Sequence, residues 1–133
     1  MPLDLGASAS MLSPLRLILV EDSKIIQARL VEALEEIQHV TIVAKVDTQR
    51  EATAILSSRE WDIVILDLQL KEGTGLGVLK SLSIQGRKKN SKIIVYTNYS
   101  FPQYKERCLE LGADYFFDKV SEFHRLMDCC RNR

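Results

Sequence analysis

Five polar residues of this chain stand at the ends of apolar runs, and their types suit metal binding and the transfer of a charged group: Glu21, Asp22, Asp67, Thr97 and Lys119. Such apolar runs are typical of buried parallel strands, whose carboxyl ends meet at the sheet edge where open α/β folds place their chemistry. We therefore expect the five side chains to converge on one edge. A single Asp after a strand is commonly a helix N-cap or a loop residue, but five such groups together favour a site.

The three acids would repel each other in a shared crevice. Two unit charges about 4 Å apart cost on the order of 4 kcal/mol at an effective dielectric near 20. Lys119 offsets this repulsion only in part, so either one acid takes up a proton or a divalent cation lies among them. Mg²⁺ is the ordinary cation for a few carboxylates and waters. The acids therefore predict either a protonated crevice or a Mg²⁺ site.

The elements that must position these residues alternate between strand-like and helical patterns. Apolar runs predict five strands, at 15–20, 41–46, 62–66, 92–96 and 115–117. Strands joined by helical crossovers form a parallel sheet with helices on both faces. The predicted fold class is therefore α/β, a doubly wound five-stranded parallel sheet, for which we favour the strand order 2-1-3-4-5. In that order the first and third strands are neighbours, which brings Glu21, Asp22 and Asp67 into one crevice.

Helix boundaries are marked by local signals. Thr48-x-x-Glu51 has the pattern of a capping box, Pro102 suits an early helical position, and Gly112 suits a C-terminal cap. Ser121 is expected to open the last helix. Five β-α units result, and they leave no room for a second domain.

Composition excludes several classes of function. A chain of 133 residues with 46% hydrophobic and 27% charged content is typical of one soluble domain with a core. Its 18 basic and 18 acidic residues cancel, so we expect no nucleic-acid partner. Its 3 cysteines are odd in number and form no C-x-x-C motif, which predicts packing roles in a reducing compartment.

The amino terminus predicts neither export nor membrane insertion. Residues 1–14 mix Pro, Gly, Ala and Ser without periodicity, and we expect them to form a disordered leader. No apolar run approaches the roughly 18 residues that a membrane span requires. We therefore expect a cytoplasmic protein with no membrane partner.

Several motifs together resemble the receiver domain of two-component response regulators, over about residues 15–131. They are Val20-Glu21-Asp22-Ser23, Leu66-Asp67, Gly73-Thr74-Gly75-Leu76, Tyr96-Thr97, and the segment from Leu111 to Lys119. Any one of them alone would be weak, but the ordered set with its spacing is specific. The resemblance implies a flavodoxin-like fold and a signalling role instead of an enzymatic one.

The resemblance also implies roles for individual residues. Asp67 would accept a phosphoryl group from a histidine kinase or a histidine phosphotransfer protein, assisted by Thr97 and Lys119. Mg²⁺ would be the cofactor, bound by Asp67, by Asp22, by Glu21 directly or through water, and by the backbone carbonyl of Gln69. Positioning and charge neutralisation supply most of the rate in such a transfer.

Output would follow from a switch at Thr97 and Phe116. The Thr97 hydroxyl would swing toward the phosphoryl group, and the aromatic ring of Phe116 would enter the space it leaves. This would change a partner surface on the fourth helix, fifth strand and fifth helix, with the residues Tyr99, Phe101, Tyr104, His124 and Arg125. Nothing follows the fifth helix except residues 131–133, so we expect the signal to leave by protein contact with a target that the sequence does not name.

Departures from the family pattern leave alternatives open. Lys71 and Val120 stand where receivers usually have proline, and a cis peptide before Val120 would cost about 2.5–4 kcal/mol. A pseudo-receiver that is not phosphorylated would keep the fold and the partner surface. A flavin-binding module is disfavoured because Glu21 and Asp22 would repel a phosphate after the first strand. A phosphatase with a nucleophilic aspartate would want a second acid where Gln69 stands.

Overall fold

Five strands and five helices alternate along the chain in a computed structural model that describes residues 13–132. The strands are β1 (Leu15–Val20), β2 (Val40–Val46), β3 (Ile63–Leu66), β4 (Lys92–Thr97) and β5 (Tyr115–Asp118). The helices are α2 (Lys24–Glu35), α3 (Gln49–Ser58), α4 (Gly75–Gln85), α5 (Pro102–Glu110) and α6 (Phe123–Arg131). The predicted strands agree with these bounds to within one residue at each end. The predicted leader lies outside the described residues, except for Ser13 and Pro14.

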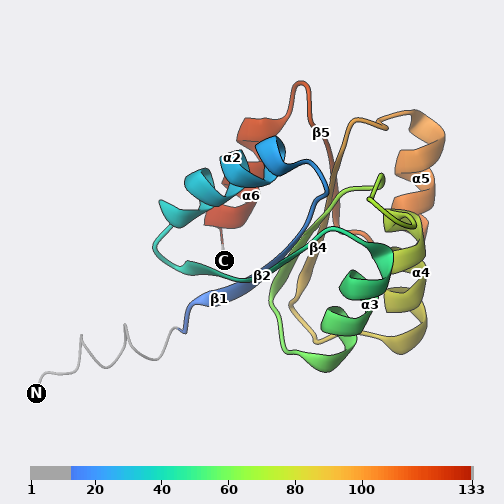
Figure 1. The fold of residues 1–133 in the computed structure, drawn as a ribbon, viewed down its shortest axis with the longest axis horizontal. Helices are drawn as coiled ribbons and strands as arrows, with labels where there is room; N and C mark the ends of the chain where they lie inside the picture. The colour runs from blue at the N-terminus through green and yellow to red at the C-terminus, as the bar shows by residue number, and fades with distance from the viewer. Residues whose placement is uncertain (1–12, 133) are drawn as a thin grey trace, which may run out of the picture.

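The sheet is parallel throughout and has the order β2-β1-β3-β4-β5, which confirms the predicted fold class. Helices α2 and α6 cover one face of the sheet, and α3, α4 and α5 cover the other (Figure 1). Strands β1 and β3 are neighbours in the middle of the sheet. The segments that leave these two strands therefore lie side by side at its carboxyl edge.

Two apolar layers hold the sheet between its helices. Alternate residues of each strand face opposite sides, so Ile18 and Val64 pack toward α3 and α4 while Leu17 and Ile65 pack toward α2 and α6. The three cysteines are buried in these layers as free thiols, as predicted. Burial raises the pKa of the Cys108 thiol to about 11, so this thiol stays protonated at neutral pH.

The local helix signals are confirmed at three of four positions. The Thr48 hydroxyl accepts a hydrogen bond from the Glu51 N–H at 3.1 Å, Pro102 opens α5, and Gly112 follows that helix with φ of 104°. The prediction for Ser121 is wrong. Glu122 is the N-cap of α6 and makes no side-chain cap bond, because its carboxylate accepts from the Asp118 N–H.

The peptide bond before Val120 and the apolar character of the helices can be read from the structure. Within the described residues there is no cis peptide bond, so the Lys119–Val120 bond is trans. None of the helices in residues 13–132 combines the length and the apolar character that crossing a membrane demands.

Asp62 joins strands β1 and β3 at the amino end of the sheet. Its carboxylate accepts hydrogen bonds from the backbone N–H of Arg16 at 2.7 Å and from the guanidinium of Arg16 at 3.1 Å. Lys88 also contacts the carboxylate. Burial acts to raise the pKa of Asp62, but these donors outweigh burial and hold the pKa well below its ordinary value.

Replacement of this carboxylate is expected to weaken the fold in a pH-dependent way. Asp62→Asn should lower the free energy of unfolding by about 1.5–3 kcal/mol at pH 7, since hydrogen bonds to a charged group are lost. A carboxyl with a depressed folded pKa stabilises above its unfolded pKa, ordinarily 3.8, and loses that contribution as the pH falls below it. Urea unfolding from pH 7 to pH 2 should therefore show the difference shrinking below about pH 3.8.

Asp128→Asn serves as the matched control for this measurement. Asp128 also pairs with an arginine, Arg131, but its side chain is 71% exposed and the pair lies one helical turn apart. Such surface ion pairs contribute little to the free energy of unfolding. A difference for Asp62→Asn that equals that of Asp128→Asn, or that does not vary with pH, would contradict the role given to Asp62.

Candidate functional site

The central strands bring the predicted acids together at the carboxyl edge of the sheet. Val20 pairs with Leu66, so the residues that follow each of them, Glu21 and Asp67, leave neighbouring strands at the same level. The backbone N–H of Asp67 donates to the Val20 carbonyl at 3.0 Å. The Glu21 N–H donates to the carbonyl of Val46 at 3.0 Å, which extends the ladder to the next strand. Backbone pairing therefore sets the spacing of the acids.

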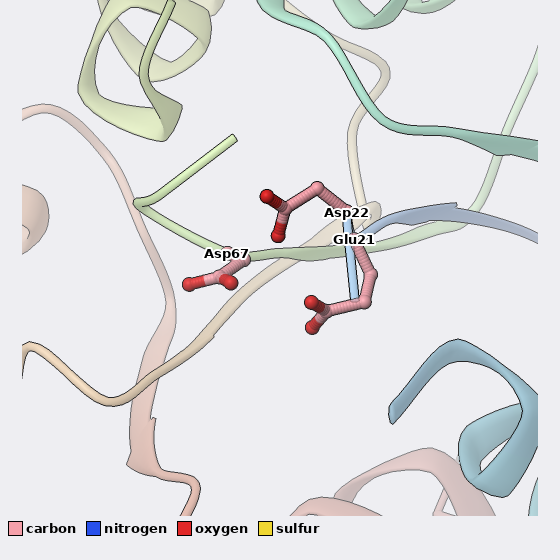
Figure 2. A group of neighbouring side chains, drawn as sticks. All are labelled: Glu21, Asp22 and Asp67. Atoms are coloured by element: carbon pink, nitrogen blue, oxygen red, sulfur yellow. The ribbon is translucent and has the colours of Figure 1, made fainter. Parts of the chain in front are cut away.

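The carboxylates of Glu21, Asp22 and Asp67 form one cluster, as predicted. One oxygen of each lies within 4.8 Å of those of the other two. Figure 2 shows Asp22 and Glu21 turned to opposite sides of the chain, with the Asp67 side chain beside them at the end of the neighbouring strand. Glu21 and Asp67 are only 1% and 5% exposed. In the part of the chain that the structure describes, the Asp22 carboxylate has no hydrogen-bond or ion-pair partner.

Lys119 neutralises part of this charge. Its ammonium lies 2.7 Å from Oε1 of Glu21 and 2.7 Å from Oδ2 of Asp67, and all three side chains are buried. Its backbone N–H donates to the Thr97 carbonyl at 3.0 Å, which fixes the segment beyond β5 to the end of β4. Burial acts to lower the pKa of Lys119, but its hydrogen bonds to Asp67 and Glu21 outweigh burial and raise the pKa. The lysine is therefore a fixed cation.

The site shifts the pKa of Glu21. Burial raises the pKa of Glu21 above its ordinary value, and the nearby charge of Asp67 adds to this effect. The Lys119 ammonium and the N–H of Ser23 act in the opposite direction, the latter from 3.0 Å. Both carboxylate oxygens of Glu21 thus accept hydrogen bonds from the protein. Burial and the charge of Asp67 thus favour proton uptake at Glu21, whereas Lys119 and Ser23 favour its charged form.

The remaining predicted residues surround this cluster. Thr97 is fully buried, and its hydroxyl accepts a hydrogen bond from the Tyr99 N–H at 3.1 Å. The Gln69 N–H donates to Oδ1 of Asp67 at 3.3 Å, whereas the Gln69 side chain is exposed. Phe116 packs with Val95 and other residues of the apolar layer below α5 and is 8% exposed. Phe116 therefore lies on the face of the sheet that α5 covers, and α5 is the fourth helix of the predicted partner surface.

The predicted partner surface carries a group of aromatic rings. The rings of Tyr99 and Phe101 lie 5.9 Å and 6.1 Å from the ring of Tyr104, centroid to centroid. Phe101 is 56% exposed although it is large and apolar. His124 and Arg125 are exposed near the start of α6. Exposed aromatic residues of this kind are enriched where proteins bind other proteins.

Residues that were not predicted from the sequence support the site from outside the cluster. Ser23 caps α2 and donates its N–H to Glu21, and Gln27 donates its side-chain amide to the Glu21 carbonyl at 3.2 Å. Gln49 accepts a hydrogen bond from Thr74 in the loop after Asp67. An N-cap signal at Ser23 was available, because Ser precedes a helical segment. No local pattern points to Gln49.

The donor set of the cluster fits Mg²⁺. Its ligand atoms are carboxylate oxygens, the hard donors that this cation takes together with water. Within the described residues the Asp22 carboxylate has no protein partner, and the cluster contains no nitrogen or sulfur donor. One lysine contacts two of the three carboxylates but carries only one positive charge, so a net negative charge remains for a cation to neutralise.

Curated proteins share the sequence pattern of this chain. The chain is 28% identical over 117 residues to the uncharacterized transcriptional regulatory protein YvfU of Bacillus subtilis, covering 88% of this chain and 58% of that protein. It is 25% identical over 116 residues to the transcriptional regulatory protein DesR of the same organism, covering 87% of this chain and 56% of that protein. The chain therefore spans about half the length of these curated relatives.

Solved structures agree with the observed fold. A DNA-binding response regulator of the LuxR family from Staphylococcus aureus matches with a TM-score of 0.78 at 24% identity, covering 89% of this chain and 99% of that chain. The phosphorylated cyanobacterial phytochrome response regulator RcpA matches with a TM-score of 0.77 at 21% identity, covering 90% of each chain. At these identities the likeness shows the fold. The family model of the response regulator receiver domain matches residues 17–131, and the chain therefore belongs to this family of two-component signalling modules.

Proposed function

We propose that this receiver domain takes a phosphoryl group on Asp67, in the presence of Mg²⁺, from a histidine kinase or a histidine phosphotransfer protein. The observation that supports this most directly is the position of the Asp67 carboxylate. It is buried, it lies within 4.8 Å of two other acids, and it contacts the Lys119 ammonium at 2.7 Å. The signal then leaves through protein contacts of the aromatic surface around Tyr99 and Tyr104.

The transfer requires little covalent chemistry from the protein. The bond between phosphorus and the donor's histidine nitrogen breaks, its electron pair stays on that nitrogen, and a bond forms between phosphorus and a carboxylate oxygen of Asp67. Lys119 holds the carboxylate in place and neutralises charge that develops on the phosphoryl oxygens. The Thr97 hydroxyl retains its own hydrogen, since it accepts from Tyr99, and can donate it to a phosphoryl oxygen.

Four residues would hold the cation. Asp22 and Asp67 would be direct carboxylate ligands, Glu21 would bind directly or through water, and the backbone carbonyl of Gln69 would complete the protein ligands. Bound Mg²⁺ supplies positive charge that favours the approach of a phosphoryl group to three acids. Without that charge the buried, acidic crevice disfavours an anionic donor.

The output rests on Thr97 and Phe116. When the Thr97 hydroxyl turns toward the phosphoryl group, its contact with the Tyr99 N–H is lost and the segment that begins the aromatic surface is released. Phe116 on β5 pairs with Val95 on β4, the strand that ends at Thr97. A movement of Thr97 therefore changes the packing around the Phe116 ring through these two paired strands. Two packed arrangements of this surface then differ in their affinity for a target.

Intact-mass measurement tests the proposal. The protein is incubated with a small phosphodonor or a phosphorylated histidine protein, with Mg²⁺ or with a chelator. A phosphoryl-sized gain in mass that requires Mg²⁺ supports a working receiver. No gain from either donor favours the alternative, a pseudo-receiver that acts as an interaction module only.

Asp22→Asn is expected to separate metal binding from folding. Because no protein group binds the Asp22 carboxylate within residues 13–132, its loss removes no hydrogen bond and relieves repulsion with the other acids. The metal-free variant should therefore be as stable as the wild type or more so. The rise in thermal midpoint that Mg²⁺ gives the wild type should be lost in the variant. A Mg²⁺-dependent rise of equal size in both proteins would contradict this assignment.

A further inference from the structure

The loop that follows Asp67, residues 68–74, is closed across its base. Gln69 and Thr74 form an antiparallel bridge between its two ends. The Gln69 N–H also donates to Oδ1 of Asp67. A displacement of Thr74 would therefore shift Gln69 and, through it, the acceptor carboxylate.

Gln49, the first residue of α3, holds this loop from the neighbouring segment. Its side-chain Oε1 accepts a hydrogen bond from the Thr74 N–H at 2.9 Å, and its backbone N–H donates to the Glu72 carbonyl at 2.9 Å. The Lys71 N–H donates to the carbonyl of Asp47 at 3.0 Å. The segment before α3 and the loop after Asp67 are thus joined by three hydrogen bonds, of which only one uses a side chain.

Two glycines create the space that the Gln49 side chain occupies. A Cβ atom on Gly73 would lie 2.4 Å from Cβ of Gln49, and one on Gly77 would lie 2.3 Å from its Nε2. Gly77 is helical and its φ is not positive, so its backbone would accept alanine. What excludes a side chain at Gly77 is the amide of Gln49. The Thr74 hydroxyl accepts a hydrogen bond from the Gly77 N–H at 3.1 Å, so Thr74 binds both Gln49 and the first turn of α4.

We infer that Gln49 is a positioning residue for the acceptor site, acting through Thr74 and Gln69 on the Asp67 carboxylate and on the Gln69 carbonyl. The inference rests on the proposed function, because its consequence is measured at the proposed Mg²⁺ and phosphoryl site. Within the described residues Gln49 makes no hydrogen bond to an acid of the cluster. Its amide sets where the loop after Asp67 lies, and supporting groups of this kind commonly change metal affinity or activity by about 10–100-fold.

The contact is tested from both sides. Gln49→Ala removes the acceptor for the Thr74 N–H, and Gly77→Ala displaces the same amide by steric overlap. Both variants should weaken Mg²⁺ affinity, measured from the dependence of the thermal midpoint on Mg²⁺ concentration, by on the order of tenfold. The rate of phosphoryl gain at limiting Mg²⁺ should fall by a similar factor. The double variant should be no worse than either single one, because both changes remove one contact.

Stability separates positioning from a purely structural role. Alanine favours a helix more than glycine does, so metal-free Gly77→Ala should unfold at an unchanged or higher urea concentration while its Mg²⁺ affinity falls. Gln49→Glu, which keeps an acceptor oxygen, should restore affinity that Gln49→Met, of similar length without an acceptor, loses. Gln38→Ala, at an exposed glutamine beyond α2, serves as the control and should match the wild type.

The outcomes distinguish the two proposals. If the wild type binds Mg²⁺ and gains a phosphoryl group while Gln49→Ala and Gly77→Ala match it, the role of Gln49 is overturned and the proposed function stands. The role of Gln49 is also overturned if the double variant loses as much Mg²⁺ affinity as the two single variants lose together. If the wild type neither binds Mg²⁺ nor gains a phosphoryl group, the proposed function fails, and the role of Gln49 fails with it.

Discussion

Asp67→Asn is expected to abolish phosphoryl gain while the protein stays folded. The substitution keeps the size of the side chain but replaces the nucleophilic carboxylate oxygen by an amide, which does not form the acyl phosphate. Crowding of negative charge falls at the same time, because Asp67 lies beside Glu21 and Asp22. The change should be visible as a complete loss of the Mg²⁺-dependent mass increase, with circular dichroism equal to that of the wild type.

Asp47→Asn is the matched control for this variant. Asp47 lies at the same edge of the sheet, beyond β2, but is outside the cluster and pairs with Lys24 at 3.7 Å. It should gain the phosphoryl group at the wild-type level. Equal mass increases in Asp67→Asn and the wild type would show that another residue is the acceptor.

Lys119→Met is expected to cause the largest loss of stability among the site variants. Removal of the ammonium leaves Glu21 and Asp67 buried and adjacent without a cation. Breaking one side of a buried ion pair typically costs about 3–5 kcal/mol. Urea unfolding at pH 7 without Mg²⁺ measures this cost. Lys24→Met, at an exposed lysine with one distant partner, should change stability by less than about 1 kcal/mol.

The pH dependence of the Lys119→Met effect follows from the directions of the pKa shifts. The folded pKa of Glu21 is raised, so the folded state binds its proton more tightly and gains stability as the pH falls through that pKa toward the ordinary value of 4.5. Loss of Lys119 raises this pKa further. The difference between variant and wild type should therefore be largest near neutral pH and shrink as the pH falls toward 4.5.

At alkaline pH the lysine itself determines the difference. The folded pKa of Lys119 lies above its ordinary value of 10.5, so its contribution is complete below that pH and is lost as the pH rises through the folded pKa. A difference that stays the same both as the pH falls toward 4.5 and as it rises well above 10.5 agrees with the loss of apolar packing by the lysine stem. It would contradict the assignment of Lys119 as the cation between two carboxylates.

The fold could be predicted because its signals are local and regular. Apolar runs that end in an acid, such as the run before Asp67, indicate buried parallel strands whatever their partners are. Only a few topologies suit such a chain, and of the two common strand orders we favour the one that the structure shows. The acidic cluster followed in turn, since Glu21 and Asp67 leave adjacent strands in that order.

The contacts around the cluster depend on details that no local pattern contains. Ser121 looked like an N-cap, but the Ser121 hydroxyl donates to Asp118 and the chain turns into α6 only after Glu122. Lys119 was expected to compensate the acids in part, whereas its contact with both Glu21 and Asp67 depends on side-chain conformation. Gln49 lies in a different segment from the loop that it binds, and its side chain fits there only because Gly73 and Gly77 have no side chains.

The location of the phosphoryl group is the most direct test of the account. Borohydride reduces an aspartyl phosphate to homoserine, so the protein is treated with donor and Mg²⁺, reduced, digested, and mapped by peptide mass spectrometry. We expect homoserine at position 67 and unchanged carboxyl groups at Glu21 and Asp22. Homoserine at another aspartate, or an unmodified residue 67 in protein that has gained a phosphoryl group, would contradict it.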